Sequence, residues 1–198
     1  MTEEQNQNPL SGDPGAAAVA SPRRWWILVA LSLATTIIQF DQSGMTLALP
    51  HVQAELEATT QQLQWVMDAY SLALASVVLT AGAISDRYGR RKVFLLGIAV
   101  LATGSLIGAL APDANVVIAG RAVMGVGGAM FMPGTLSIIT HVFDRDTRPN
   151  AIGIWGAVTS LGVIIGPLIS GAVLQIWHWR GIFILNVVMA AIAFTGAA

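Results

Sequence analysis

The chain alternates long apolar segments with short polar ones. Six apolar segments cover about residues 25–49, 63–84, 93–111, 115–140, 151–174 and 181–198. An α-helix rises about 1.5 Å per residue, so each segment is long enough to cross the roughly 30 Å hydrocarbon core of a bilayer. The pattern therefore predicts an all-α integral membrane protein with six transmembrane helices.

Composition supports this fold class. Hydrophobic residues make up 55% of the chain, charged residues 11%, and the mean hydropathy is +0.67, whereas about a quarter of the residues in a soluble domain are charged. Residues 1–24 are instead rich in polar residues, Pro, Gly and Ala, and we expect a disordered cytoplasmic tail there. The apolar run of about 25 residues that follows suits a membrane span better than a cleaved leader.

Positive charges gather in alternate polar segments. Eight of the ten Lys and Arg residues lie in the tail, in the segment between the second and third spans, and in the segment between the fourth and fifth spans. The intervening segments carry Arg180 alone. Basic loops stay on the cytoplasmic side, so the sequence predicts a multi-pass protein of the cell membrane with a cytoplasmic N-terminus.

The sequence gives no support for an enzyme, a metal site, a cofactor site or a nucleic-acid-binding protein. The chain has no cysteine, and its histidines, at positions 51, 141 and 178, are scattered. No acid/base pair shares a face, and no cofactor or nucleotide motif is present. We therefore expect no enzymatic activity, no metal, no cofactor and no nucleic-acid partner.

Two charges inside predicted spans are the main candidates for function. A carboxylate or guanidinium at mid-span costs about 2.5–3.5 kcal/mol on an insertion scale and is normally kept for function. We expect Asp41 to face a wet cavity; the alternative is a side chain that reaches outward to the membrane surface. Arg121, in the fourth span, is the second such charge; the alternative is that it lies at the outer interface and binds lipid phosphate. Asp68, early in the second span, lines an outer vestibule or is an exposed helix-end carboxylate.

The segment GAISDRYGRRK, residues 82–92, predicts a tight turn between the second and third spans. Gly89 supplies the positive φ that such a turn needs. Asp86 lies at the C-terminal end of a helix, where a negative charge is unfavourable, so we expect an arginine or another helix N-terminus beside it.

Smaller features complete the prediction. Thr59 or Thr60 is placed to cap the second helix, and we assign no chemistry to Glu55 or Glu57. Trp179 and Arg180 are expected to anchor at the outer interface. In the fifth span, small residues at helical spacing allow close helix contact and a proline bends the helix: Gly162, Gly166, Pro167, Ser170 and Gly171.

Four motifs together resemble one family. The pattern G-x-x-x-D-R-x-G-R-R-K, which contains Gly82, Asp86, Arg87, Gly89, Arg90 and Arg91, resembles the loop between helices two and three of the major facilitator superfamily. FDQSGMTLALP around Asp41 resembles the helix-one motif of its fourteen-helix drug:proton antiporters, although Gly44 and Met45 depart from it. RAVMGVGGA at Arg121 is similar to the helix-four motif, with Met124 in place of Gln. GVIIGPLISG resembles the helix-five antiporter motif, and WHWRGIFILN resembles the start of helix six.

This resemblance implies a function. The chain is expected to be the N-terminal half-bundle of a transporter, built from two inverted three-helix repeats and completed by a missing C-terminal half. The intact protein would export hydrophobic, cationic drugs or toxic compounds in exchange for protons. Asp41 would bind the proton or the cation, Arg121 would adjust that equilibrium, and Asp68 would line the path. Asp86 and Arg90 would latch the cytoplasmic side, and Gly166 with Pro167 would form the bending interface. Small-molecule substrates, protons and membrane lipids are the expected partners.

Two alternatives remain open at the level of the sequence. The protein exports a specific endogenous metabolite, sugar or antibiotic, since two acidic residues do not exclude a neutral substrate. Alternatively, it is a non-transporting six-helix remnant or partner subunit, against which the intramembrane charges argue because they are costly to keep without use.

Overall fold

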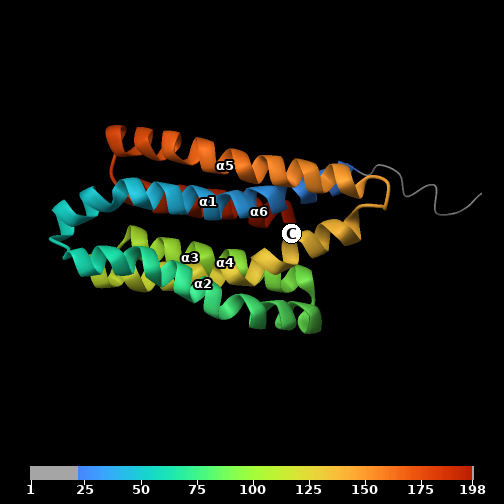
Figure 1. The fold of residues 1–198 in the computed structure, drawn as a ribbon, viewed down its shortest axis with the longest axis horizontal. Helices are drawn as coiled ribbons and strands as arrows, with labels where there is room; N and C mark the ends of the chain where they lie inside the picture. Colours follow the sequence, from blue (N-terminus) through green and yellow to red (C-terminus); the bar gives the residue numbers. More distant parts are fainter. Residues whose placement is uncertain (1–21, 198) are drawn as a thin grey trace, which may run out of the picture.

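A computed structural model describes residues 22–197, so almost all of the expected tail, residues 1–24, lies outside the described part. Six helices follow one another with short connections (Figure 1). Their bounds are α1 Pro22–Leu56, α2 Thr60–Tyr88, α3 Arg90–Ala109, α4 Ala114–Val142, α5 Arg148–Ile176 and α6 Arg180–Ala197. All six are long and apolar enough to cross a membrane, and the predicted all-α, six-helix membrane fold is confirmed.

Local sequence sets where the helices begin and turn. Thr59 caps α2: its hydroxyl accepts from the Gln62 N–H at 3.2 Å, and the Gln62 side chain accepts from the Thr59 N–H at 3.0 Å. This reciprocal pair satisfies two backbone donors at the helix start. Gly89 separates α2 from α3 with φ of 102°, as the sequence predicts. Asp113 caps α4 by accepting from two backbone N–H groups.

The helix α1 continues past Pro50 to Leu56 instead of ending near residue 49. Proline removes one backbone hydrogen bond, but the extension is held at its far end by tertiary contacts of Glu55 with residues at the start of α6. These contacts carry the helix beyond the apolar span that the sequence defines.

The helices form two groups of three with reciprocal packing. In the α1 group, α1 packs against α5 and α6; in the α4 group, α4 packs against α2 and α3. Figure 1 shows α5 along one edge of the molecule, α2 along the other, and the remaining helices between them. The first helix of each three-helix run thus packs against the second and third helices of the other run, an arrangement that inverted three-helix repeats produce. Contacts between α3 and α6 join the two groups.

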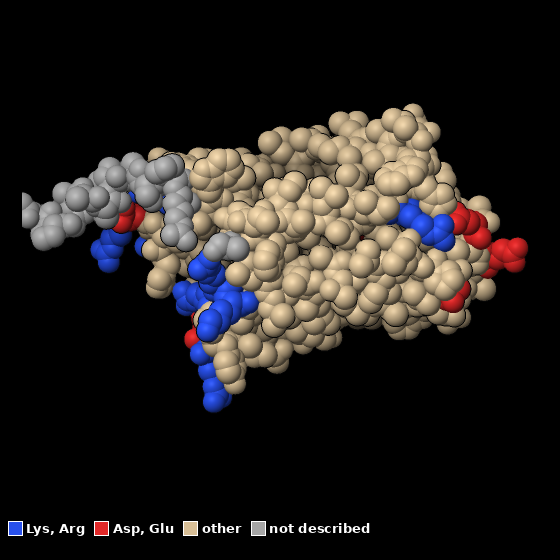
Figure 2. All heavy atoms as spheres, turned by 180° about the vertical axis from the view of Figure 1, so that it is seen from behind, with Lys and Arg blue, Asp and Glu red and all other residues tan. Residues whose placement is uncertain are grey.

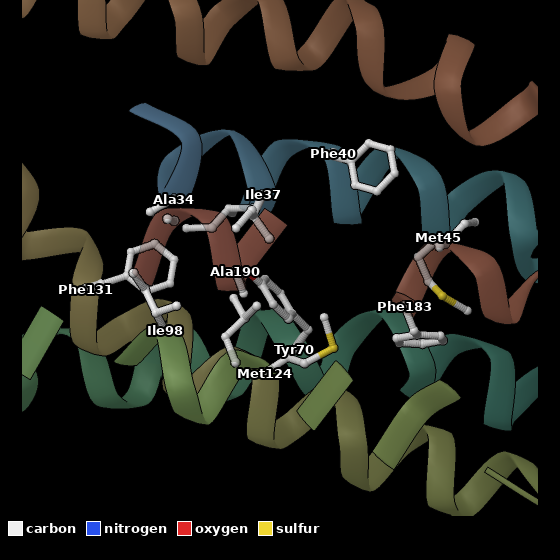
Figure 3. Close-up of a cluster of buried hydrophobic side chains, with 14 of the residues drawn as sticks. Ala34, Ile37, Phe40, Met45, Tyr70, Ile98, Met124, Phe131, Phe183 and Ala190 are labelled. Atoms are coloured by element: carbon white, nitrogen blue, oxygen red, sulfur yellow. The ribbon is translucent and has the colours of Figure 1, made fainter. Parts of the chain in front are cut away.

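Glycines, among them Gly125 and Gly127, allow α4 to approach its neighbours. A Cβ on Gly127 would lie 2.7 Å from the Gly97 carbonyl oxygen of α3, and one on Gly125 would lie 2.9 Å from Ala73 Cβ of α2. Small residues permit this backbone proximity in membrane helices. The interior next to these contacts is filled by apolar side chains from several helices, among them Met124, Phe131 and Phe183 (Figure 3).

The helices α2 and α5 are the least buried. Only 17% of the apolar window of each is buried, against 50–56% for α1, α3 and α4. Their exposed faces carry large apolar side chains such as Leu79, Ile164 and Leu168. These faces are suited to contact with lipid or with further protein within the membrane.

The basic residues separate along the helix axes. Figure 2 shows most Lys and Arg at one end of the molecule, whereas Asp and Glu lie at both ends. We call the first end the basic end, and it carries Arg24, Arg87, Arg90, Arg91, Lys92, Arg145 and Arg148. The opposite end carries Arg180 next to Glu55.

Candidate functional site

A buried ion pair lies between the two helix groups. Asp41, near the middle of α1, pairs with Arg121 of α4, and their side chains are 1% and 0% exposed. Asp41 Oδ1 also accepts a hydrogen bond from Asn186 Nδ2 of α6 at 2.7 Å. The structure therefore brings together the two intramembrane charges that the sequence singles out, which are 80 residues apart.

Arg121 is held on its other side by α2. Its Nε donates to the Val66 carbonyl oxygen at 2.9 Å, and its guanidinium carbon lies 4.6 Å from the centroid of the Tyr70 ring. A cation over an aromatic face is attracted by the ring quadrupole, more strongly when both are desolvated. The guanidinium is thus anchored within the α4 group, whereas Asp41 is anchored within the α1 group.

This burial corrects one expectation and rules out two alternatives for these charges. Asp41 does not face a wet cavity, because Arg121 and Asn186 supply the hydrogen bonds that water would otherwise provide. It also does not reach outward to the membrane surface. Arg121 does not lie at the outer interface, since its side chain is fully buried. An unpaired charge inside a protein is strongly unfavourable, so each side chain makes the burial of the other possible.

The pair is only partly satisfied by its surroundings. Arg121 Nη2, Asn186 Oδ1 and the Tyr70 hydroxyl are buried and have no hydrogen-bond partner within the described residues. In a low-dielectric interior unpaired polar groups are costly, so the stability of this network depends strongly on the charge of each member. Protonation of Asp41 would leave Arg121 without its counter-ion, so the site can link binding of a proton to a change in helix packing.

A polar stripe follows the partly exposed face of α1 beside this pair. Its members recur at helical spacing: Thr36, Gln39, Gln42, Ser43 and Thr46. Gln42 Nε2 approaches Ser71 Oγ of α2 at 3.4 Å. Asp68 of α2 is half-buried and is in no salt bridge within residues 24–197. The structure thus places Asp68 outside the buried network, with the Gln42 and Ser71 contact one turn away along α2.

The small residues of α5 pack against α1, but not all of them take part. A Cβ on Gly162 would lie 2.7 Å from Thr36 Cγ2, and one on Gly166 would meet Ser43 Oγ and lie 3.4 Å from Phe40 Cα. Gly171 has no such neighbour within 4 Å among the described residues, and Pro167 is exposed. Gly162 and Gly166 pack closely against α1, whereas close packing of Gly171 stays a prediction, because Gly171 meets no neighbour among the described residues.

The turn at the basic end contains the predicted charge partner. Arg90 Nε and Nη2 donate to Asp86 Oδ1 at 3.1 and 3.0 Å, so an arginine answers the carboxylate at the end of α2. Arg91 Nε donates to the Ala197 carbonyl oxygen at 3.0 Å and connects α3 with the end of α6. The guanidinium of Arg87 lies over the Tyr88 ring at 5.6 Å. Gly82 lies near Pro133 of α4, since a Cβ there would be 3.8 Å from the Pro133 Cβ.

At the opposite end, Glu55 organises a second cluster. Its carboxylate accepts from Arg180 Nη1 at 2.6 Å and from Trp179 Nε1 at 2.9 Å, and it contacts His178. Arg180 Nη2 donates to the Ala111 carbonyl oxygen at 3.0 Å. The expectation that Trp179 anchors at the membrane interface is wrong, because its ring is 2% exposed and its N–H is bound to Glu55.

The profile of the family described as Major Facilitator Superfamily matches residues 31–198. The chain belongs to the Major Facilitator Superfamily. A solved structure of the peptide transporter POT in complex with sulfate has the same fold, with a TM-score of 0.75 at 18% identity over 86% of this chain and 36% of that chain.

Curated relatives from this superfamily include three bacterial proteins. The chain is 36% identical to the multidrug efflux pump LfrA of Mycolicibacterium smegmatis over 90% of this chain and 35% of that protein. It is 35% identical to a puromycin resistance protein of Streptomyces alboniger (99% and 39%) and 36% identical to a methyl viologen resistance protein of Salmonella typhimurium (83% and 34%). The chain therefore spans little more than a third of the length of these superfamily members.

Sequence reasoning missed three contributors to these contacts. Asn186 falls within the motif at the start of helix six, Tyr70 is not singled out by the sequence, and Glu55 is assigned no chemistry. An amide within an otherwise apolar span was the available signal for Asn186, because a buried polar group is normally hydrogen-bonded. No comparable signal identified Glu55, since acidic residues in a polar loop are ordinary.

Proposed function

We propose that this chain forms the N-terminal six-helix half of a proton-coupled antiporter of the cell membrane that exports hydrophobic, cationic compounds. The observation that carries the proposal is the buried pair of Asp41 and Arg121 between the two helix groups. Support also comes from relatives whose names state multidrug efflux or resistance to puromycin and methyl viologen.

The proposed mechanism follows from the charge of the pair. The Asp41 carboxylate is stabilised by Arg121 and accepts a hydrogen bond from Asn186. A proton that reaches Asp41 neutralises it and removes its attraction for the guanidinium, which stays bound to Val66 and Tyr70. A cationic compound bound near Asp41 favours the deprotonated carboxylate, so that proton and substrate are bound in alternation. Asp68 supplies a second carboxylate on the outer part of the same path.

The remaining half is proposed to cover the exposed faces of α2 and α5. Those faces carry large apolar side chains, and the relatives extend well beyond the span of this chain. Superfamily members move one six-helix half against the other around a midplane site. Gly171, on an outward side of α5, is then available for contact with that half.

The charges at the basic end define the proposed orientation and gate. Basic loops remain cytoplasmic, so the end that carries Arg90 would face the cytoplasm. The pair of Asp86 and Arg90 is exposed and joins α2 to α3. We propose that this pair latches the cytoplasmic side in one conformation of the transport cycle, with Arg87 and Arg91 as basic partners in the same loop.

The proposal is tested with the full-length protein that contains this chain, purified and reconstituted in lipid vesicles. Proton flux driven by tetraphenylphosphonium, a lipophilic cation, is measured for the wild type, Asp41→Asn and Arg121→Ala. We expect Asp41→Asn to reduce coupled proton flux at least about tenfold, because the amide cannot exchange a proton. Arg121→Ala is expected to change the pH dependence of flux. Asp146→Asn, at an exposed aspartate of the basic end, serves as the matched control and should behave as wild type.

Two results contradict the proposal. Coupled proton flux that persists in Asp41→Asn removes this carboxylate from the mechanism, and an unaltered pH dependence in Arg121→Ala removes the guanidinium from the coupling step. Substrate class is tested by competition between tetraphenylphosphonium and the neutral triphenylphosphine oxide. Equal competition by the neutral compound argues against cation selectivity and favours export of an endogenous neutral compound.

A further inference from the structure

We infer that Asn186 is a positioning residue that holds the Asp41 carboxyl group in both of its protonation states and sets the pH at which that group exchanges its proton. The inference rests on the proposed proton coupling at Asp41. Asn186 is 0% exposed and lies on α6, and its Nδ2 donates to Asp41 Oδ1 at 2.7 Å across 145 residues of sequence. This hydrogen bond joins α6 to α1 inside the α1 group.

The chemistry of the amide differs from that of the guanidinium. Arg121 offers only hydrogen-bond donors, so it pairs with the charged form of Asp41. Asn186 has both a donor and an acceptor, and its Oδ1 is buried with no partner among the described residues. A half-turn of the amide presents Oδ1 to a protonated carboxyl group, which then donates its proton to that oxygen. Asn186 can therefore bond to either form of Asp41.

Because Arg121 and Asn186 differ in this way, protonation of Asp41 weakens one of its two helix contacts and leaves the other. When Asp41 is neutral, the link from α1 to α4 through Arg121 weakens, whereas the link from α1 to α6 through Asn186 persists. Arg121 remains bound to the Val66 carbonyl oxygen and the Tyr70 ring of α2. Protonation thus loosens the contact between the α1 group and the α4 group while Asp41 stays attached to α6.

A purely structural role for Asn186 makes a different prediction. A buried amide that only fills space and satisfies a neighbour would contribute to stability, and its loss would lower the melting temperature. It would not change the pH at which substrate displaces a proton. The pH profile of proton release is therefore the readout that separates positioning of Asp41 from packing.

The test uses the purified full-length protein and measures proton release on addition of tetraphenylphosphonium across a range of pH. Release falls at high pH, once Asp41 is already deprotonated. We expect Asn186→Leu to move the midpoint of this fall upward by about one pH unit, because the bond that the amide donates to the charged carboxylate is stronger than the bond it makes with the neutral carboxyl group. Ser32→Ala is the control: Ser32 is buried on α1, its hydroxyl has no partner within the described residues, and it lies nine positions before Asp41. Its midpoint should equal that of the wild type.

A second variant keeps the inference testable if Asn186→Leu fails to fold. Asn186→Ala removes the same donor with a smaller side chain and adds no titratable group. We expect the same upward shift of the midpoint. A midpoint equal to that of the wild type in either folded variant overturns the inference.

The outcome for Asp41→Asn separates this inference from the proposed function. If Asp41→Asn still releases protons on addition of the cation, the proposed function fails. If Asp41→Asn loses release but the Asn186 variants keep the wild-type midpoint, only the role of Asn186 is overturned.

Discussion

The carboxylate of Glu55, on the last turn of α1, accepts a hydrogen bond from Arg180 Nη1 at the start of α6 at 2.6 Å. Arg180 also donates to the Ala111 carbonyl oxygen between α3 and α4, and Trp179 donates to the same Glu55 carboxylate. Glu55 therefore binds the start of α6 directly, and through Arg180 it is linked to the connection between α3 and α4. The ends of α1 and α6 belong to the α1 group, whereas Ala111 follows α3 of the α4 group.

This cluster leads to a prediction about stability. Glu55→Ala removes the acceptor of two hydrogen bonds and leaves the Trp179 N–H without its partner, so we expect the melting temperature of the full-length protein in detergent to fall by about 2–4 °C. Glu57→Ala is the matched control, because Glu57 is exposed two positions further on and is in no ion pair within residues 24–197. Equal melting temperatures for the two variants would show that the cluster adds nothing to stability.

A second prediction concerns the ring and the hydroxyl of Tyr70. The ring lies against the Arg121 guanidinium, while the hydroxyl is buried without a partner in the described part of the chain. Tyr70→Phe keeps the ring and removes an unsatisfied polar group, so its melting temperature should equal or exceed that of the wild type. Tyr70→Leu loses the cation–π contact and should melt at a lower temperature. A lower melting temperature for Tyr70→Phe would mean that the hydroxyl is hydrogen-bonded in the membrane.

The third prediction compares two glycines with different surroundings. A Cβ on Gly127 would press on backbone atoms of α3, 2.7 Å from the Gly97 carbonyl oxygen and 2.8 Å from Leu101 Cα. Backbone atoms cannot move aside without separating the helices, so we expect Gly127→Ala to destabilise the protein by about 1–3 kcal/mol. Gly153→Ala, on α5 with no such neighbour within 4 Å among the described residues, should be neutral or slightly stabilising. Thermal unfolding of the two variants measures the difference, and a stable Gly127→Ala would contradict the close approach of α3 and α4.

The fourth prediction separates gating from stability at the basic end. The side chains of Asp86 and Arg90 are 67% and 37% exposed, and exposed ion pairs contribute little to folding. Asp86→Asn should therefore change the melting temperature by no more than about 1–2 °C. Transport should nevertheless fall several-fold if the pair latches one conformation.

Asp144→Asn is the matched control for that variant. Asp144 is exposed and pairs with the largely buried Arg24 at the same end, at 3.6 Å, but it lies outside the turn between α2 and α3. Uptake of tetraphenylphosphonium into inverted vesicles should be reduced by Asp86→Asn and unchanged by Asp144→Asn. Equal transport by both variants would remove the latch from the mechanism.

The gap between sequence and structure is clearest at Asp41. Periodicity and composition place this residue inside an apolar helix, and the cost of burying a charge marks it as functional. Nothing in the one-dimensional pattern states whether the charge is satisfied by water or by a protein partner. The wet cavity was therefore a reasonable but wrong expectation, and the fully buried Arg121 and Asn186 are the partners that replace it.

The helix-five motif shows the same limit. Small residues at helical spacing predict close packing, and Gly162 and Gly166 do pack against α1. Gly171 belongs to the same motif, yet it points to open space in this bundle. Spacing along the chain defines which residues are small, but the rotation of α5 about its own axis decides which of them meet a neighbour.

The sequence by itself determined the number and nature of the helices, the gathering of positive charge at one end and the turn at Gly89, and it narrowed the cap of the second helix to Thr59 or Thr60. These features depend on hydropathy and on residues within about one helical turn of each other. Only the tertiary structure decided which charges meet. The contacts of Arg121 with Val66, of Arg121 with Asp41 and of Asn186 with Asp41 span 55, 80 and 145 residues. Such contacts depend on the rotation and mutual packing of whole helices, which many small contacts set together and no single motif specifies.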